Sequence, residues 1–263
     1  MLTDTHCHLD FDWFDNDRAQ VIDRARAVGL ERLLNPGITI KSSNNAIKLA
    51  DEYAEVFAAV GVHPNDGLSW DNKSISTLRE LASHPKVVAI GEIGLDYYRD
   101  RTPKDVQKRI FLEQLELAAE LHLPVVVHCR EAMGDMLEIL SAWQARLNES
   151  QSTIAKYPGV LHSFSGNMAE GEKIRNSNFK LGLTGPITFQ NAKALQDLVI
   201  RLPLSSILIE TDAPFLTPHP YRGKRNEPGR VKLVAEKVAE LHQEAYNTVT
   251  KITAANAAEL FGW

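Results

Sequence analysis

Two histidines, His6 and His8, stand two positions apart directly after a short apolar run at the start of the sequence. On a β-strand, residues i and i+2 point to the same face, so both imidazoles can reach one metal ion. The same pair would also fit a buried strand whose neutral imidazoles make ordinary hydrogen bonds. A pair of ligands does not close a site, because even a catalytic zinc takes about three protein ligands. The other ligands must come from elsewhere in the chain.

Other groups that can bind metals also follow short apolar runs. They are His63, Glu92, His128, His162 and Asp212. A single histidine is more often a hydrogen-bonded core residue than a ligand, but so many such groups at the ends of predicted strands are hard to obtain by chance. The other histidines lie in predicted helices or beside prolines, and we expect no role in the site for them: His84, His122, His219 and His242.

The stretches between these residues alternate between short runs rich in Val, Ile and Leu and longer runs with helical spacing. The short runs predict strands at residues 2–6, 32–35, 56–62, 87–92, 124–128, 159–162, 180–184 and 206–211. The longer runs predict helices at residues 17–28, 42–54, 74–82, 103–121, 131–145, 168–176, 191–200 and 229–244. This repeat predicts an α/β fold, a (β/α)₈ TIM barrel, with an extra C-terminal helix at residues 248–260. Reactive residues of such barrels meet at the carboxyl ends of the strands.

The composition is that of an ordinary globular protein, with 44% hydrophobic and 24% charged residues in a chain of 263. We expect one domain over residues 1–263. The net charge of -5 argues against a protein coated in basic charge, so any affinity for phosphate must be local. The two cysteines form no disulfide framework, and we find neither a secretory signal nor a membrane span. We expect a cytoplasmic protein without a membrane contact or an obligate protein partner.

The number of candidate ligands predicts two divalent metal cations. Four histidines and two carboxylates exceed the ligand set of one zinc, whereas a carboxylate can bridge two ions. The expected ligands are His6, His8, Glu92 and Asp212 for one ion, and Glu92, His128 and His162 for the other, with Glu92 as the bridge. A water or hydroxide between the ions would be the nucleophile, and Asp212 the general base. We expect zinc in the isolated protein, with manganese and magnesium as alternatives.

Basic residues near the expected mouth of the barrel are candidates for substrate binding. Arg222, Lys224 and Arg225 follow the eighth predicted strand, and Arg130 follows His128. At the mouth they could hold a phosphate group, although so short a charge run fits a solvated turn equally well. We expect His63 to contact water or substrate from outside the ligand set.

Some neighbouring residues are expected to support the ligands or line the mouth. Asp4 shares a strand face with His6, and Glu210 shares one with Asp212. Either carboxylate could orient a ligand imidazole, or it could be satisfied by a nearby backbone amide or cation. Asp96, Tyr97 and Tyr98 follow Glu92 in a loop and could line the mouth. Aromatic rings there could stack on a nucleobase, although a pair of tyrosines more often serves packing.

Several longer motifs follow one another in order over nearly the whole chain. They are DTHCHLD at residues 4–10, GVHP at 61–64, GEIGLD at 91–96, HCR at 128–130, HSFSG at 162–166, ETDAP at 210–214 and YRGKRN at 221–226. Together they resemble the TatD family of metal-dependent hydrolases. The resemblance implies an amidohydrolase-type barrel, two divalent metals on the ligands named above, and hydrolysis of phosphate esters, with some members acting as deoxyribonucleases. The chain departs from the pattern after His63 and Pro64, where Asn65 and Asp66 follow and relatives often carry another histidine.

These observations leave three hypotheses about function. The first is a metal-dependent phosphodiesterase that acts on a phosphate ester, with single-stranded DNA as one candidate. The second is an amidohydrolase or deaminase for a small neutral substrate. Amide-cleaving enzymes on this barrel often bridge their metals with a carbamylated lysine, whereas this chain has Glu92 at that place. The third, a catalytically idle barrel that binds a partner, does not explain the complete ligand set.

Overall fold

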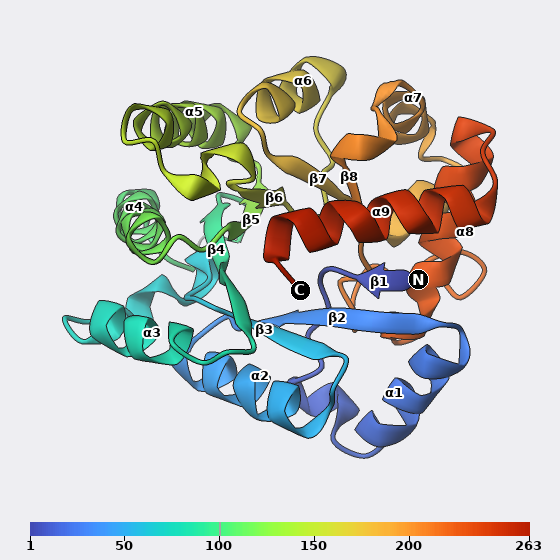
Figure 1. Cartoon of the computed structure of the whole chain (residues 1–263), viewed down its shortest axis with the longest axis horizontal. Helices are drawn as coiled ribbons and strands as arrows, with labels where there is room; N and C mark the ends of the chain where they lie inside the picture. Colours follow the sequence, from blue (N-terminus) through green and yellow to red (C-terminus); the bar gives the residue numbers. More distant parts are fainter. Residues whose placement is uncertain (100) are drawn as a thin grey trace.

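The computed structural model describes residues 1–99 and 101–263, and within them eight strands form one sheet (Figure 1). Strands that are consecutive in the chain are neighbours in the sheet, and the pairs are parallel. The strands are β1 Leu2–Asp4, β2 Leu30–Pro36, β3 Val56–Val60, β4 Val87–Asp96, β5 Val125–Arg130, β6 Gly159–Leu161, β7 Lys180–Leu183 and β8 Ile207–Ile209. The sheet curls into a nearly closed ring, which confirms the predicted TIM barrel.

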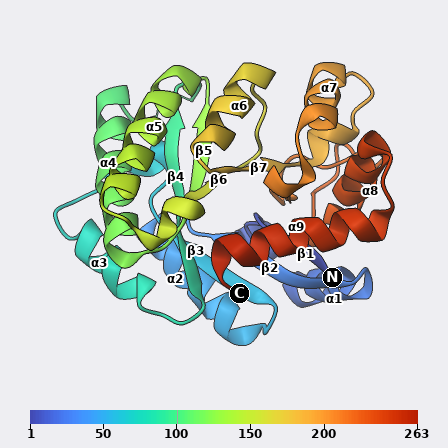
Figure 2. The same ribbon diagram turned by 45° about the horizontal axis from the view of Figure 1, so that its top comes forward.

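A helix follows each strand and lies outside the ring (Figure 1, Figure 2). The helices are α1 Arg18–Ala27, α2 Ile40–Glu52, α3 Ser74–Ala82, α4 Lys104–Leu121, α5 Met133–Glu149, α6 Met168–Asn176, α7 Lys193–Arg201 and α8 Val231–His242. In α5, for example, Met136, Leu140 and Trp143 are buried at the spacing of one helical face, which packs toward the sheet. In the described part of the chain, none of the helices has both the length and the apolar character needed to cross a membrane.

Backbone contacts beyond the ends of β1 and β8 bring the two edges of the ring together. The amide of Asp212 donates to the carbonyl of His6 over 2.8 Å, and the amide of His8 donates to the carbonyl of Ala213 over 2.8 Å. Cys7 forms a parallel bridge with Ala213 between these bonds. The prediction that the first strand extends through residue 6 is therefore wrong at its end, since β1 stops at Asp4 and the histidines lie in the closing seam.

The strand β4 is longer than predicted and irregular where it carries Glu92. Its pairing with β5 shifts register between Ile90 and Ile93, because β4 has one residue more than its partner there. Such a bulge changes the direction in which a side chain points. The predicted end of this strand at residue 92 is wrong, because β4 continues to Asp96 and Glu92 lies inside it.

The C-terminal helix α9, Tyr246–Phe261, lies across one end of the ring (Figure 1, Figure 2). It confirms the predicted extra helix. Leu260 and Phe261 of α9 join an apolar cluster with residues from the strands, namely Leu34, Ala59, Val88, Ala89, Val126, Val160 and Leu208. Asn256 of α9 also donates to the carbonyls of Leu204, just before β8, and Ile207, the first residue of β8. The helix α9 therefore covers the amino-terminal end of the barrel. The carboxyl ends of the strands lie on the opposite side.

We predict that Gly94→Ala destabilises the protein. Gly94 lies in β4 at a φ of 141°, and a Cβ there would overlap the backbone of His128 in β5. The forbidden dihedral and the overlap together should lower the free energy of unfolding by about 2–5 kcal/mol in urea denaturation. Gly134→Ala in α5, where a Cβ meets open space, is the control and should raise stability by up to about 1 kcal/mol. Equal effects of the two substitutions would contradict the strain argument.

Candidate metal centre

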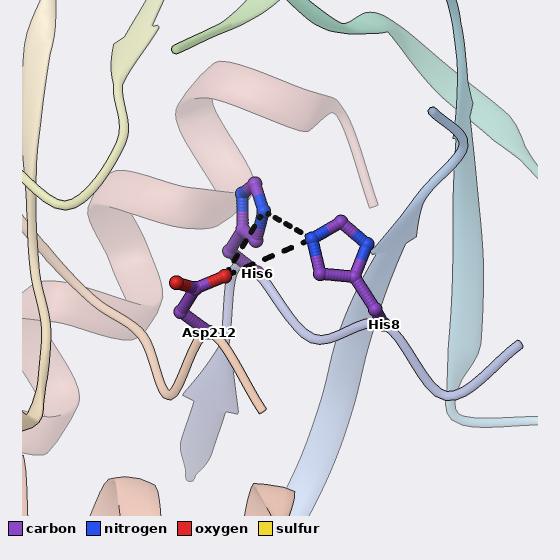
Figure 3. A group of neighbouring side chains, drawn as sticks. All are labelled: His6, His8 and Asp212. Carbon is purple, nitrogen blue, oxygen red and sulfur yellow. Dashed lines mark hydrogen bonds and ion pairs between the residues drawn. The ribbon is translucent and has the colours of Figure 1, made fainter. Parts of the chain in front are cut away.

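The side chains of His6, His8 and Asp212 meet where β1 and β8 end (Figure 3). The Nε2 atoms of the two histidines are 3.2 Å apart, and each lies 3.7 Å from Oδ1 of Asp212. Each Nε2 also lies 3.4 Å from Oε2 of Glu92. Ligand atoms arranged tetrahedrally around one zinc are about 3.4 Å apart. These separations therefore fit atoms that share one cation.

The other oxygen of Glu92 faces a second group of imidazoles. Its Oε1 lies 2.9 Å from Nδ1 of His128 and 3.1 Å from Nε2 of His162. The two ring nitrogens are 3.3 Å apart. The candidate ligand atoms thus surround both oxygens of Glu92. They form overlapping clusters, because Glu92 and His162 also lie close to His6, and Glu92 and His128 lie close to His63. The assignment of the ligands to two ions stays a prediction. Nitrogen and carboxylate donors without a thiolate suit zinc, manganese or magnesium.

His63 also reaches the carboxylate of Glu92. Its Nδ1 accepts a hydrogen bond from the amide of Asn65 over 3.1 Å, which leaves Nε2 facing Glu92 Oε1 at 3.6 Å. Its ring centroid lies 4.4 Å from that of His128. The structure places His63 in the same cluster as the expected ligands, where it can contact a metal, a water or a substrate. Its assignment to substrate contact stays a prediction.

The charges in this cluster compensate one another. Burial by itself raises the pKa of Glu92, but the imidazoles of His162, His63 and His6 outweigh burial and hold that pKa well below its usual value. Burial lowers the pKa of His8, but the hydrogen bond to Glu92 and the negative charges of Glu92, Asp212 and Asp10 together outweigh burial and raise the pKa of His8 to about 9. Ligand imidazoles must be neutral, so a metal ion would displace protons from this cluster on binding.

Asp96 stands behind His128. Its Oδ2 lies 3.3 Å from Nε2 of His128 and accepts a hydrogen bond from Nδ2 of Asn65 over 3.0 Å. The amides of Tyr98 and Arg99 donate to its other oxygen. From the sequence we expected Asp96 only to line the mouth. The alternation of β4 was the signal for a closer role, because Asp96 follows Glu92 at an even spacing and so shares its face.

Of the two roles considered for Asp4, the structure shows the second, in which backbone amides satisfy the carboxylate. Its Oδ1 accepts hydrogen bonds from the amides of His6 and Thr211, and its Oδ2 accepts one from the hydroxyl of Thr211. Asp4 therefore holds the backbone of the closing seam. Burial raises its pKa to about 8.

Glu210 does lie beside a ligand imidazole, as expected. Its Oε2 is 3.8 Å from Nδ1 of His162 and accepts a hydrogen bond from the amide of Ser163 over 3.0 Å. Its other oxygen accepts a bond from the hydroxyl of Thr5. Burial raises the pKa of Glu210 to about 7. Glu210 thereby joins the loop after β6 to the start of the closing seam.

The predicted substrate-binding cations differ in what they contact. Arg130 is exposed and lies 3.9 Å above the ring of Tyr98, and Arg222 is exposed and lies 4.5 Å above the ring of Phe189. Lys224 is exposed as well. Its Nζ lies 5.9 Å from the centre of the Tyr221 ring.

Arg225 is already engaged by the protein. Its Nη1 and Nη2 atoms donate to the two carboxylate oxygens of Asp17 over 2.8 and 2.7 Å, and Nη1 also donates to the carbonyl of Trp13. A paired guanidinium of this kind ties the loop after β8 to the segment after β1.

Known proteins similar to this chain point to one family. The family model described as TatD related DNase matches residues 3–262. YabD of Bacillus subtilis, described as an uncharacterized metal-dependent hydrolase, is 42% identical over 261 residues, with 99% of both chains covered. A 3'-5' ssDNA/RNA exonuclease TatD from Cronobacter turicensis is 39% identical over 254 residues, covering 94% of this chain and 93% of the relative.

A solved structure agrees with these matches. The crystal structure of YjjV, a TatD homolog from Escherichia coli, has a TM-score of 0.91 and 30% sequence identity, and the match covers 100% of this chain and 98% of that chain. The resemblance seen in the motifs is thereby confirmed over the whole barrel.

We predict that Asp96→Asn weakens binding of a divalent cation. The substitution removes the negative charge next to His128, and loss of a group that orients a metal ligand typically costs about 10- to 100-fold in affinity. Titration calorimetry with zinc and with manganese measures the change. Asp105→Asn, on the exposed first turn of α4, is the control and should bind as the wild type does. Wild-type affinity in Asp96→Asn would exclude a supporting role for this carboxylate.

Proposed function

This chain belongs to the TatD family of metal-dependent hydrolases, and we propose that it cleaves phosphodiester bonds of single-stranded polynucleotides at a centre of two divalent cations. The observation that carries the proposal is the position of Glu92, whose two oxygens face separate groups of imidazoles. A carboxylate placed in this way suits a bridge between two ions. The relative from Cronobacter turicensis, named as an exonuclease for single-stranded DNA and RNA, supports the substrate class and attack from the 3′ end.

The proposed ligands are those expected from the sequence. The ligands of one ion would be His6, His8, Glu92 and Asp212, and those of the other Glu92, His128 and His162. Two divalent cations at this site would supply neutralisation of phosphate charge and acidification of water. The protein would hold the imidazoles in place through Asp96 behind His128 and Glu210 beside His162.

We assign the role of general base to Asp212. Its backbone has a φ of 55°, in the left-handed region that a residue other than glycine seldom adopts, and such strain often marks an active site. In the proposed reaction, water gives a proton to the Asp212 carboxylate as its oxygen forms a bond to phosphorus. The ester P–O bond breaks on the opposite side, and the departing oxygen takes up a proton from solvent. Burial raises the pKa of Asp212, which favours proton uptake.

The proposed contacts to substrate phosphates are the exposed residues Arg130, Arg222 and Lys224. His63 is proposed to contact substrate or water beside Glu92. A contact from Arg225 to substrate would have to compete with the two bonds that Asp17 already accepts. Hydrolysis of an amide has less support, because β4 carries Glu92 and no lysine.

We also propose that the protein is a single domain and that it lies in the cytoplasm. One domain over residues 1–263 is supported by the single eight-stranded sheet. The helix α9 packs on the same sheet. A cytoplasmic location is supported by the free thiols of Cys7 and Cys129, which a reducing compartment maintains.

We predict that Glu92→Ala and His128→Ala abolish hydrolysis and leave the fold largely intact. Loss of the central carboxylate or of one imidazole should lower kcat/KM for a single-stranded oligonucleotide by at least about 10³-fold, the equivalent of about 4 kcal/mol of transition-state stabilisation. Addition of a chelator should have the same effect on the wild type. His84→Ala, on a surface pair with Asp51, is the control.

The substrates are a single-stranded oligonucleotide, a small phosphodiester and a panel of cyclic amides, and circular dichroism checks the fold of each variant. Full activity in either site variant would refute the assigned centre. Cleavage of the amides without cleavage of a phosphodiester would refute the proposed reaction and leave the centre in place.

We predict that Arg130→Gln lowers the salt dependence of binding to single-stranded DNA. The logarithm of the binding constant falls linearly with the logarithm of the salt concentration, and each lost phosphate contact should reduce the magnitude of that slope by about 0.7. Fluorescence anisotropy in a Glu92→Ala background measures binding without cleavage. Arg109→Gln, on an exposed i,i+4 pair in α4, is the control. An unchanged slope in Arg130→Gln would show that this guanidinium does not contact phosphate.

A further inference from the structure

Three aromatic side chains lie together beside the candidate metal centre, and we call them the aromatic platform: the half-buried Phe11 and the exposed Trp13 and Phe215. The ring of Phe215 packs edge-on against both others, with centroids 6.0 Å from Phe11 and 5.9 Å from Trp13. Trp13 is 54% exposed and Phe215 is 42% exposed. Large aromatic rings grouped on a surface mark a binding site more often than scattered apolar residues do.

The platform is joined to two of the proposed metal ligands. The ring of Phe11 stacks on the imidazole of His8, with centroids 4.7 Å apart and planes inclined by 17°. The amide of Phe215 donates to the carbonyl of Asp212 over 2.8 Å. The row of rings therefore starts at the metal centre and leads outward along the loops that follow β1 and β8.

Contacts on both sides fix the backbone that carries Trp13. The next residue, Phe14, is fully buried, so the short helix that carries both residues is anchored in the core. The carbonyl of Trp13 accepts a bond from Arg225, which is itself paired with Asp17. A rigid aromatic ring held open to solvent loses little conformational entropy when it binds a ligand.

We propose that the aromatic platform stacks a nucleobase of the substrate strand next to the phosphate that is cleaved. This inference rests on the proposed function. Stacking suits this protein because its net charge of -5 limits the contribution of general electrostatic attraction to a polyanion. Every base has a π-face, so the platform accepts any sequence. It favours single strands, whose bases are free to stack on a protein, over a duplex.

The test compares an oligo-thymidylate with the same strand lacking its 3′-terminal bases. For the wild type, removal of the bases should raise KM by about 5- to 150-fold and change kcat little, since one base–aromatic stack is worth about 1–3 kcal/mol. For Trp13→Ala, the intact strand should have a similarly raised KM, and removal of the bases should have little further effect. Trp13→Phe, which keeps a π-face, should restore most of the discrimination.

Leu68→Ala is the matched control, because Leu68 is 71% exposed in the loop after β3 and has no π-face to stack. It should discriminate between the two strands as the wild type does. An equal penalty for the missing bases in wild type and in Trp13→Ala would overturn the platform, even if both enzymes cleave the strands. Failure of the wild type to cleave either strand in a chelator-sensitive way would instead refute the proposed function. Base stacking would then be tested by quenching of Trp13 fluorescence with oligo-thymidylate, using Trp13→Phe as the reference, and absent quenching would overturn it.

Discussion

The interaction on which this structure depends is that between the buried carboxylate of Glu92 and the imidazoles around it. A buried carboxylate is costly unless charges and hydrogen bonds compensate it. Here each oxygen has its own group of ring nitrogens, and the imidazoles hold the pKa of Glu92 low despite its burial. The bulge in β4 directs the side chain to this position. The cluster is thus arranged for positive charge, which protons or divalent cations can supply.

Closure of the barrel and assembly of the centre use the same bonds. The amide of Asp212 reaches the carbonyl of His6, and Asp4 binds Thr211 across the same seam. A barrel that failed to close here would also separate His6 and His8 from Asp212. At the opposite end, α9 packs on an apolar cluster of strand residues. This arrangement is typical of the fold, in which the reactive residues lie at the carboxyl ends of the strands and the opposite end of the barrel contributes to stability.

The mouth of the barrel combines few exposed cations with exposed aromatic rings. Arg130 and Arg222 each lie over an aromatic side chain. The aromatic platform begins at Phe11, which stacks on His8, and reaches Trp13 through Phe215. In an acidic protein this combination places recognition in the loops after the strands, where a rigid scaffold supports them. Phosphate and base would then be recognised by different groups on neighbouring loops.

The sequence by itself determined the barrel and the residues that meet at its mouth, because alternating apolar runs report strands and helices directly and because strand ends of a parallel barrel share one edge. It also singled out Glu92 as the group between two sets of histidines. Only the tertiary structure decided which oxygen of Glu92 faces which imidazoles, that Asp96 stands behind His128, that Asp4 serves the backbone, and that Arg225 is taken up by Asp17. These outcomes depend on a bulge and on contacts between segments far apart in the chain. Local sequence patterns carry no information about which distant residues a side chain contacts.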